Sequence, residues 1–96
     1  MSPEMARARV VVEGRVQGVG FRYFVAEQAQ EFGIKGWVRN RWDDSVEITA
    51  EARKPALERF LERVRRGPRS AFVSDVKVEW SPATGEFIAF SVRPTV

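Results

Sequence analysis

A glycine-rich stretch over residues 14–22 has the composition of an anion-binding loop. Its sequence is Gly-Arg-Val-Gln-Gly-Val-Gly-Phe-Arg, and the glycines allow the backbone to curl until successive N–H groups converge. Arg22 closes the stretch with a guanidinium group that can hold two phosphate oxygens at once. The same residues also suit an ordinary glycine-rich turn followed by a solvated arginine, so both interpretations stay open for this stretch alone.

Two familiar phosphate-binding motifs do not fit these glycines. A P-loop requires Lys followed by Ser or Thr after its last glycine, and neither pair occurs here. The dinucleotide fingerprint requires a third glycine three residues after Gly20, where the chain has Tyr23. A phosphate bound at this stretch would therefore be held in another way.

A second candidate lies in the sequence Gly-Trp-Val-Arg-Asn over residues 36–40. Strand alternation places Asn40 on the same face as the apolar Val38, and a buried amide needs a hydrogen-bond partner. An amide both donates and accepts, so Asn40 is suited to position a water molecule. The alternative is that it supports a turn at Asp43 and Asp44.

The residue types that the chain lacks limit its chemistry. The 96 residues include no Cys and no His, which excludes disulfides, thiolate or imidazole metal sites and histidine-based nucleophile systems. The 16 Lys and Arg exceed the 13 Asp and Glu by only three, which favours an anionic ligand but is weak support for nucleic-acid binding. Asp43 and Asp44 suit a turn better than a metal site, because a cation needs further ligands.

Hydrophobic periodicity predicts the elements that position these residues. Alternation of period two predicts strands, and apolar residues at helical spacing predict two helices. Gly33 and the pair Gly67-Pro68 end the helices, and Pro55 opens the second one. The expected strands cover residues 6–13, 35–42, 45–52, 72–80 and 87–93, and the expected helices cover residues 21–32 and 55–66.

The order β-α-β-β-α-β, with a short extra strand or extended edge at the end, is typical of the ferredoxin-like fold. We expect an α+β protein built as a two-layer α/β sandwich, whose antiparallel sheet carries both helices on one face. Residues 1–5 are expected to be a flexible N-terminus and residues 6–96 a single domain. The longest aliphatic run is Val10–Val12, so we expect neither a membrane span nor a signal peptide, and a cytoplasmic monomer.

The two stretches together resemble the signature pair of the acylphosphatase family. The resemblance runs from about Ala6 to Arg93 and includes Asn-Arg-x-Asp at residues 40–43 and Gly-Pro-x-x-Ala at residues 67–71. It implies a small single-domain enzyme with the ferredoxin-like sandwich. Such enzymes hydrolyse the carboxyl–phosphate bond of acyl phosphates without a metal or cofactor, so the expected ligands are a small acyl phosphate and inorganic phosphate or sulfate.

The resemblance also implies roles for individual residues. It assigns the catalytic roles to Arg22, which would bind the substrate, and to Asn40, which would position the water; the substrate's own phosphate oxygen would accept the water proton. Asp44 and Ala52 depart from the glycines that many members carry, which leaves the hairpin geometry in question. The family's phosphate-binding loop falls on Arg15, Val16, Gln17, Gly18, Val19 and Gly20.

Two other functions compete with this interpretation. The same sandwich hosts RNA-recognition domains, which display stacked aromatic residues on central strands. The strand over residues 45–52 instead carries Glu47 and Glu51 and no aromatic residue, so we expect no nucleic-acid partner. A binding-only domain, like those at the start of larger hydrogenase-maturation proteins, ranks lower because both expected catalytic positions are intact.

Overall fold

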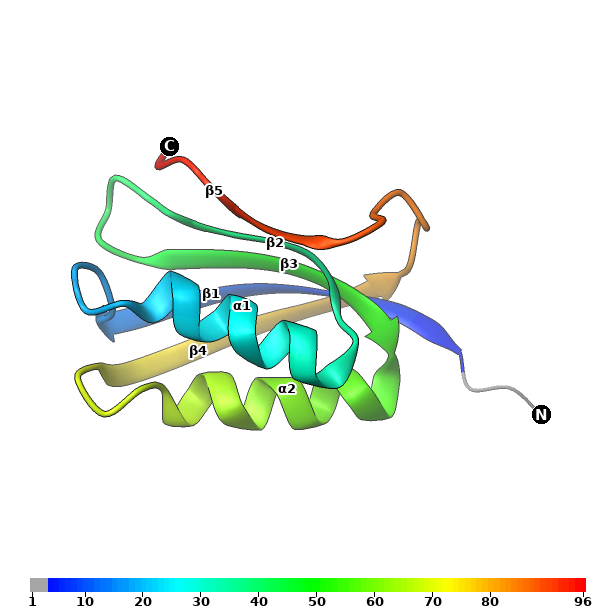
Figure 1. Cartoon of the computed structure of the whole chain (residues 1–96), viewed down its shortest axis with the longest axis horizontal. Helices are drawn as coiled ribbons and strands as arrows, with labels where there is room; N and C mark the ends of the chain where they lie inside the picture. Colours follow the sequence, from blue (N-terminus) through cyan, green and yellow to red (C-terminus); the bar gives the residue numbers. More distant parts are fainter. Residues whose placement is uncertain (1–3) are drawn as a thin grey trace.

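The computed structural model describes residues 4–96, which form one five-stranded sheet and two helices (Figure 1). Residues 1–3 of the expected flexible N-terminus lie outside the described residues. Neither described helix is both long enough and apolar enough to cross a lipid bilayer. The elements are β1 (Met5–Arg15), α1 (Phe21–Phe32), β2 (Lys35–Asn40), β3 (Val46–Arg53), α2 (Lys54–Arg66), β4 (Phe72–Pro82) and β5 (Phe90–Arg93).

The sheet has the order β4-β1-β3-β2-β5, and both helices cover one of its faces (Figure 1). The first four strands pair antiparallel, as predicted, whereas β5 pairs parallel with β2. The sheet is therefore mixed rather than purely antiparallel. The cause is the connection after β4. The strand β4 ends at the edge of the sheet where β2 begins. A segment that crosses the sheet at this edge therefore starts β5 beside the start of β2, and the two strands run in the same direction.

The hydrophobic core lies between the sheet and the helices, on the faces that the periodicity predicts. The central strands contribute alternate residues, and each helix contributes one apolar stripe. These side chains form one buried cluster between the sheet and the two helices. The fully or almost fully buried side chains include Ala8, Val10, Val12, Val38, Val46, Ile48 and Ala50 from the strands, and Phe21, Val25, Ala29, Leu57, Phe60, Leu61 and Val64 from the helices.

Several strand ends differ from the prediction. Gly14 does not end the first strand, because β1 continues to Arg15 through an irregularity between Glu13 and Gly14. Gly14 has φ +128°, and a Cβ there would lie 2.1 Å from the carbonyl oxygen of Phe72, so only glycine fits this bulge. The strand predicted over residues 35–42 ends at Asn40 instead, because the chain turns there: the N–H of Asp44 bonds to the carbonyl of Arg41, and the N–H of Arg41 bonds to the carbonyl of Ser45.

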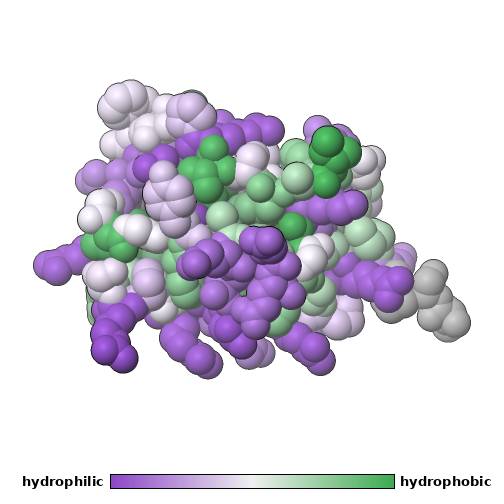
Figure 2. Space-filling view, viewed as in Figure 1, coloured by the Kyte–Doolittle hydropathy of each residue, from purple (hydrophilic) through white to green (hydrophobic). Residues whose placement is uncertain are grey.

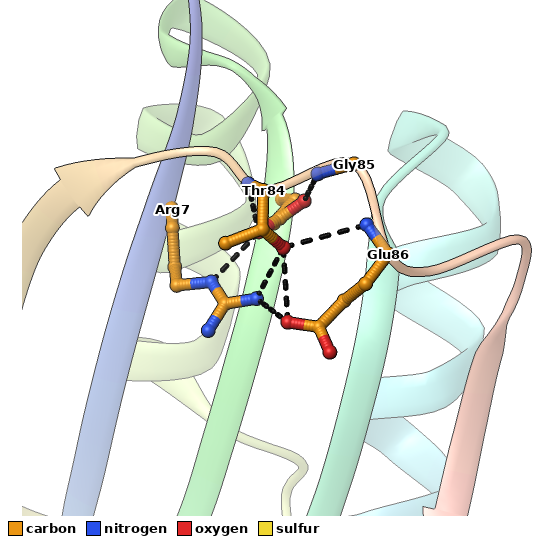
Figure 3. A network of polar contacts seen from close by, with 5 residues as sticks. Arg7, Thr84, Gly85 and Glu86 are labelled. Atoms are coloured by element: carbon orange, nitrogen blue, oxygen red, sulfur yellow. Dashed lines mark hydrogen bonds and ion pairs between the residues drawn. The ribbon is translucent and has the colours of Figure 1, made fainter.

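The sheet face opposite the helices is polar but unexpectedly well covered. Glu51 on β3 is only 3% exposed, and Arg7 Nε donates to its carboxylate at 2.7 Å. The N–H groups of Thr84 and Gly85 donate to the same carboxylate at 2.9 and 3.0 Å, and Arg7 also pairs with Glu86. This network fixes the segment between β4 and β5 against the sheet (Figure 3).

Candidate active site

The loop between β1 and α1 has the backbone geometry of an anion-binding nest. Gly18 and Gly20 have φ +73° and +77°, in the left-handed region, on either side of Val19. A Cβ at either glycine would meet no atom within 4 Å, so glycine is required for the backbone angles and not for space. Left-handed residues in such a turn let neighbouring N–H groups converge, which is how backbone amides bind anions.

The loop leads directly into the N-terminus of α1. Gly20 is the N-cap residue and supplies no capping side chain, and the first turn of α1 carries no acidic residue. The first N–H groups of a helix have no partner within the helix, and the dipole makes this end positive. An anion placed here would therefore meet both the loop amides and the helix N-terminus.

Two side chains brace the loop from outside. Gln17 Nε2 donates to the carbonyl oxygens of Arg41 and Ser45, at 2.8 and 2.9 Å. Ser70 Oγ donates to the carbonyl of Val19 at 2.9 Å. The Gln17 side chain thus ties the loop to the turn that follows Asn40, a role that the sequence pattern did not indicate.

Arg22 lies in the first turn of α1, half-buried, with most of its hydrogen-bonding capacity unused. Nη1 donates to the carbonyl of Arg93 over a long 3.4 Å. In the described part of the chain, no carboxylate forms an ion pair with this guanidinium. The positive charge is therefore available to an external anion.

Asn40 is the last residue of β2, and its side chain is oriented toward the core-facing side of the sheet. Its Oδ1 is buried, yet it has no hydrogen-bond partner among residues 4–96. A buried amide oxygen without a partner costs about 1–3 kcal/mol. This arrangement gives the structure no benefit, so it indicates that the amide serves something other than the fold.

The turn after Asn40 is supported by a different residue. Asp43 accepts hydrogen bonds from the hydroxyl and the backbone N–H of Ser45, and these bonds lower the pKa of Asp43. The alternative interpretation, in which the Asn40 side chain holds the turn, is therefore wrong. Asp44 has φ +72°, which Asp tolerates better than most residues. The strands β2 and β3 pair in register up to the turn, where Asn40 pairs with Val46. The departure from glycine at position 44 leaves the hairpin intact.

A small pocket of about 220 Å³ joins the two candidate regions. It contains the expected catalytic residues Arg22 and Asn40, although they come from different elements. Of the expected loop residues, Arg15, Gln17 and Val19 do not line it. Tyr23 was not predicted as a site residue, although its position next to Arg22 in the first turn of α1 could have indicated it. The lining consists of Val16, Gly18, Gly20, Phe21, Arg22, Tyr23 and Asn40.

Carboxylates do not contribute to this pocket. Among residues 4–96, no group of three or more Asp and Glu side chains is arranged to hold a metal ion. The pocket therefore offers an anion a guanidinium, backbone amides and one carboxamide. Such a set can bind a phosphoryl group and orient a small molecule beside it.

The comparisons with known proteins all point to the same family. The sequence profile of the acylphosphatase family matches residues 8–92. Acylphosphatase from Pyrobaculum aerophilum is 48% identical over 94 residues, which cover 97% of this chain and 99% of that protein. The crystal structure of acylphosphatase from Bacillus subtilis has a TM-score of 0.89 and 43% identity, over 92% of this chain and 98% of that chain.

A longer protein contains a similar fold. The crystal structure of full-length HypF in its phosphate- and nucleotide-bound form has a TM-score of 0.89 and 26% identity, over 99% of this chain but 13% of that chain. The profile match and the near-complete coverage of the shorter relatives agree on one assignment. By sequence and by fold, the chain belongs to the acylphosphatase family of enzymes.

Proposed function

We propose that the protein hydrolyses acyl phosphates to a carboxylate and inorganic phosphate, without a metal or cofactor, and that the reaction takes place in the 220 Å³ pocket. Arg22 and the backbone N–H groups of the loop hold the phosphoryl oxygens, and Asn40 positions the attacking water. Support comes from the pocket, which brings an unpaired guanidinium, the glycine loop and the carboxamide to one place. Family membership supports the same reaction.

The observation that carries the proposal is the unengaged carboxamide of Asn40. The buried Oδ1 has no hydrogen-bond partner among the described residues, so this oxygen is available to a molecule bound in the pocket. The oxygen can accept a hydrogen bond from a water molecule and so direct the water's lone pair toward phosphorus. A water bound in this way would also satisfy the buried amide.

The reaction needs little acid–base help. The water oxygen forms a bond to phosphorus while the bond from phosphorus to the carboxyl oxygen breaks, and the carboxylate leaves with the electron pair. A carboxylate is a good leaving group, so it needs no proton from the protein. The proton lost by water passes to a phosphoryl oxygen, and the products are a carboxylate and inorganic phosphate. Positioning and charge stabilisation then supply the catalysis.

Steady-state hydrolysis of benzoyl phosphate in excess EDTA tests this function. The protein should turn over the substrate, inorganic phosphate should compete with it, and Arg22→Ala should lower kcat/KM by about 10²–10³, the effect of losing one preorganised donor. Arg59→Ala removes an exposed arginine from α2 and serves as the matched control with normal activity. Activity that EDTA abolishes, or an Arg22→Ala variant as active as Arg59→Ala, would contradict the proposal.

A further inference from the structure

A large cavity lies directly beside the candidate site. It is a groove of about 620 Å³ between α1 and the segment that leads into β5. Tyr23 lines both this groove and the 220 Å³ pocket, so the two cavities share a wall. From Tyr23 the groove follows α1 to Gly33 at the helix C-terminus, a distance of roughly 15 Å at the helical rise.

The groove is apolar and exposed. Ile88 is 92% exposed and Tyr23 is 68% exposed. The other apolar side chains of the lining are Ala26, Ala29, Ile34, Ala89 and Phe90. The charged residues of the lining are Glu27 and Lys35. Figure 2 shows hydrophobic side chains gathered in the upper half of this face, where α1 meets the β5 side of the molecule. Large apolar side chains left in water at such a place mark a binding surface.

The outer wall of the groove is held in place from both ends. On one side, the carboxylate of Glu51 accepts hydrogen bonds from the N–H groups of Thr84 and Gly85. On the other side, the N–H of Gly36 donates to the carbonyl of Ala89 at 3.0 Å. Ile88 lies between these anchors, so its exposure belongs to a fixed wall rather than to a loose loop.

We propose that this groove binds the carbon chain of the acyl group, so that the enzyme prefers acyl phosphates with an extended apolar chain. The inference rests on the proposed function, because it places the phosphoryl group in the 220 Å³ pocket. The leaving carboxylate then faces Tyr23, and the chain continues along α1 toward Ile88. The shared wall at Tyr23 favours this occupant, because a chain attached to a bound phosphoryl group enters the groove without a second binding event.

Substrate length provides the test. Each buried methylene strengthens binding by up to about fourfold, and an open groove gives only part of this effect. From acetyl to butanoyl, hexanoyl and octanoyl phosphate, we expect KM to fall stepwise, by about tenfold or more in total. We expect kcat to change little, since the reacting groups are the same.

Ile88→Asp tests the groove directly. A carboxylate in the outer wall should remove most of the preference for octanoyl over acetyl phosphate, measured as the ratio of their KM values. Ile88 is almost fully exposed, so the change should not disturb folding. Met5→Ser is the control, because it makes polar an exposed apolar residue of β1 that does not line the groove, and it should keep the wild-type ratio.

The outcomes separate the inference from the function on which it rests. Failure to hydrolyse any acyl phosphate would contradict the proposed function. Hydrolysis with a KM independent of chain length, or an Ile88→Asp variant with the wild-type ratio, would overturn the groove assignment alone. Sedimentation gives a further check: a dimer that Ile88→Asp dissociates, together with a length-independent KM, would assign the groove to a second copy of the chain instead.

Discussion

Arg22 occupies a position where its charge is unfavourable for the helix that carries it. It lies in the first turn of α1, where the dipole is positive and a cation is disfavoured. Its one hydrogen bond, to the Arg93 carbonyl, is long at 3.4 Å. The residue therefore contributes little to the fold, and its charge is best explained by an anionic ligand.

This argument predicts that Arg22 reduces stability while it supports activity. Arg22→Ala should raise the free energy of unfolding by about 0.3–1 kcal/mol, because it removes a cation from the positive end of α1. Urea unfolding without phosphate would measure the change, and Arg59→Ala in α2 gives the baseline for losing an exposed arginine. An Arg22→Ala variant less stable than Arg59→Ala would mean that Arg22 has a structural role.

The sequence predicted the residues with local signals and missed those that act over a distance. Arg22, Asn40 and two loop glycines, which line one pocket, could be proposed as site residues because their types and spacing are visible along the chain. The role of Gln17 was not, because its side chain bonds to carbonyls 24 and 28 residues away. Such partners depend on how β2 and β3 pack beside the loop, and no local pattern records this.

At the scale of elements, the site depends on a connection between the loop and the β2–β3 turn. Gln17 makes this connection through two hydrogen bonds, and Asn40 lies at the end of β2, just before the turn. The glycine loop and Asn40 are therefore held at a fixed separation. Precise separation matters because a displacement of about 1 Å can cost a reaction roughly 10²-fold.

We expect Gln17→Ala to lower both stability and activity. The variant loses two hydrogen bonds of about 0.5–1.5 kcal/mol each in the free energy of unfolding, although both carbonyls keep a backbone donor. We expect kcat/KM to fall by about tenfold or more as the loop loosens. Ser70→Ala removes the exposed bond to the Val19 carbonyl and should cost less in both measurements. Equal effects of the two variants on kcat/KM would show that Gln17 does not position the site.

At the scale of the whole molecule, one crossing segment sets both the sheet topology and the groove. Residues 83–89 connect β4 to β5, and Glu51 holds their first part through backbone and side-chain hydrogen bonds. Periodicity predicted every helix and the core faces, since these depend on local spacing. It did not predict the parallel pairing of β5 or the burial of Glu51, because both depend on where this segment crosses the sheet.

Glu51 should make stability depend on pH. Burial by itself would raise its pKa, but hydrogen bonds from Thr84, Arg7 and Gly85 outweigh burial and lower the pKa below its ordinary value of 4.5. A lowered pKa in the folded state means that the stabilisation is complete above pH 4.5 and is lost as the pH falls toward the folded-state pKa.

Urea unfolding across this pH range would measure the effect. Glu51→Gln should cost about 1–3 kcal/mol at pH 7 and should flatten the pH dependence below pH 4.5. Glu79 pairs with Arg9 at the surface and is 76% exposed, so Glu79→Gln should change stability by less than about 0.5 kcal/mol. A Glu51→Gln variant with the wild-type slope would exclude Glu51 as the source of the pH dependence.

The most direct test of the proposed mechanism is the steady-state turnover of Asn40→Ala on benzoyl phosphate in excess EDTA, with folding checked by circular dichroism. If Asn40 orients water rather than phosphate, as proposed, kcat should fall by about 10²-fold while KM stays within about threefold of the wild-type value. A folded Asn40→Ala enzyme whose kcat is close to that of the wild type would contradict the mechanism.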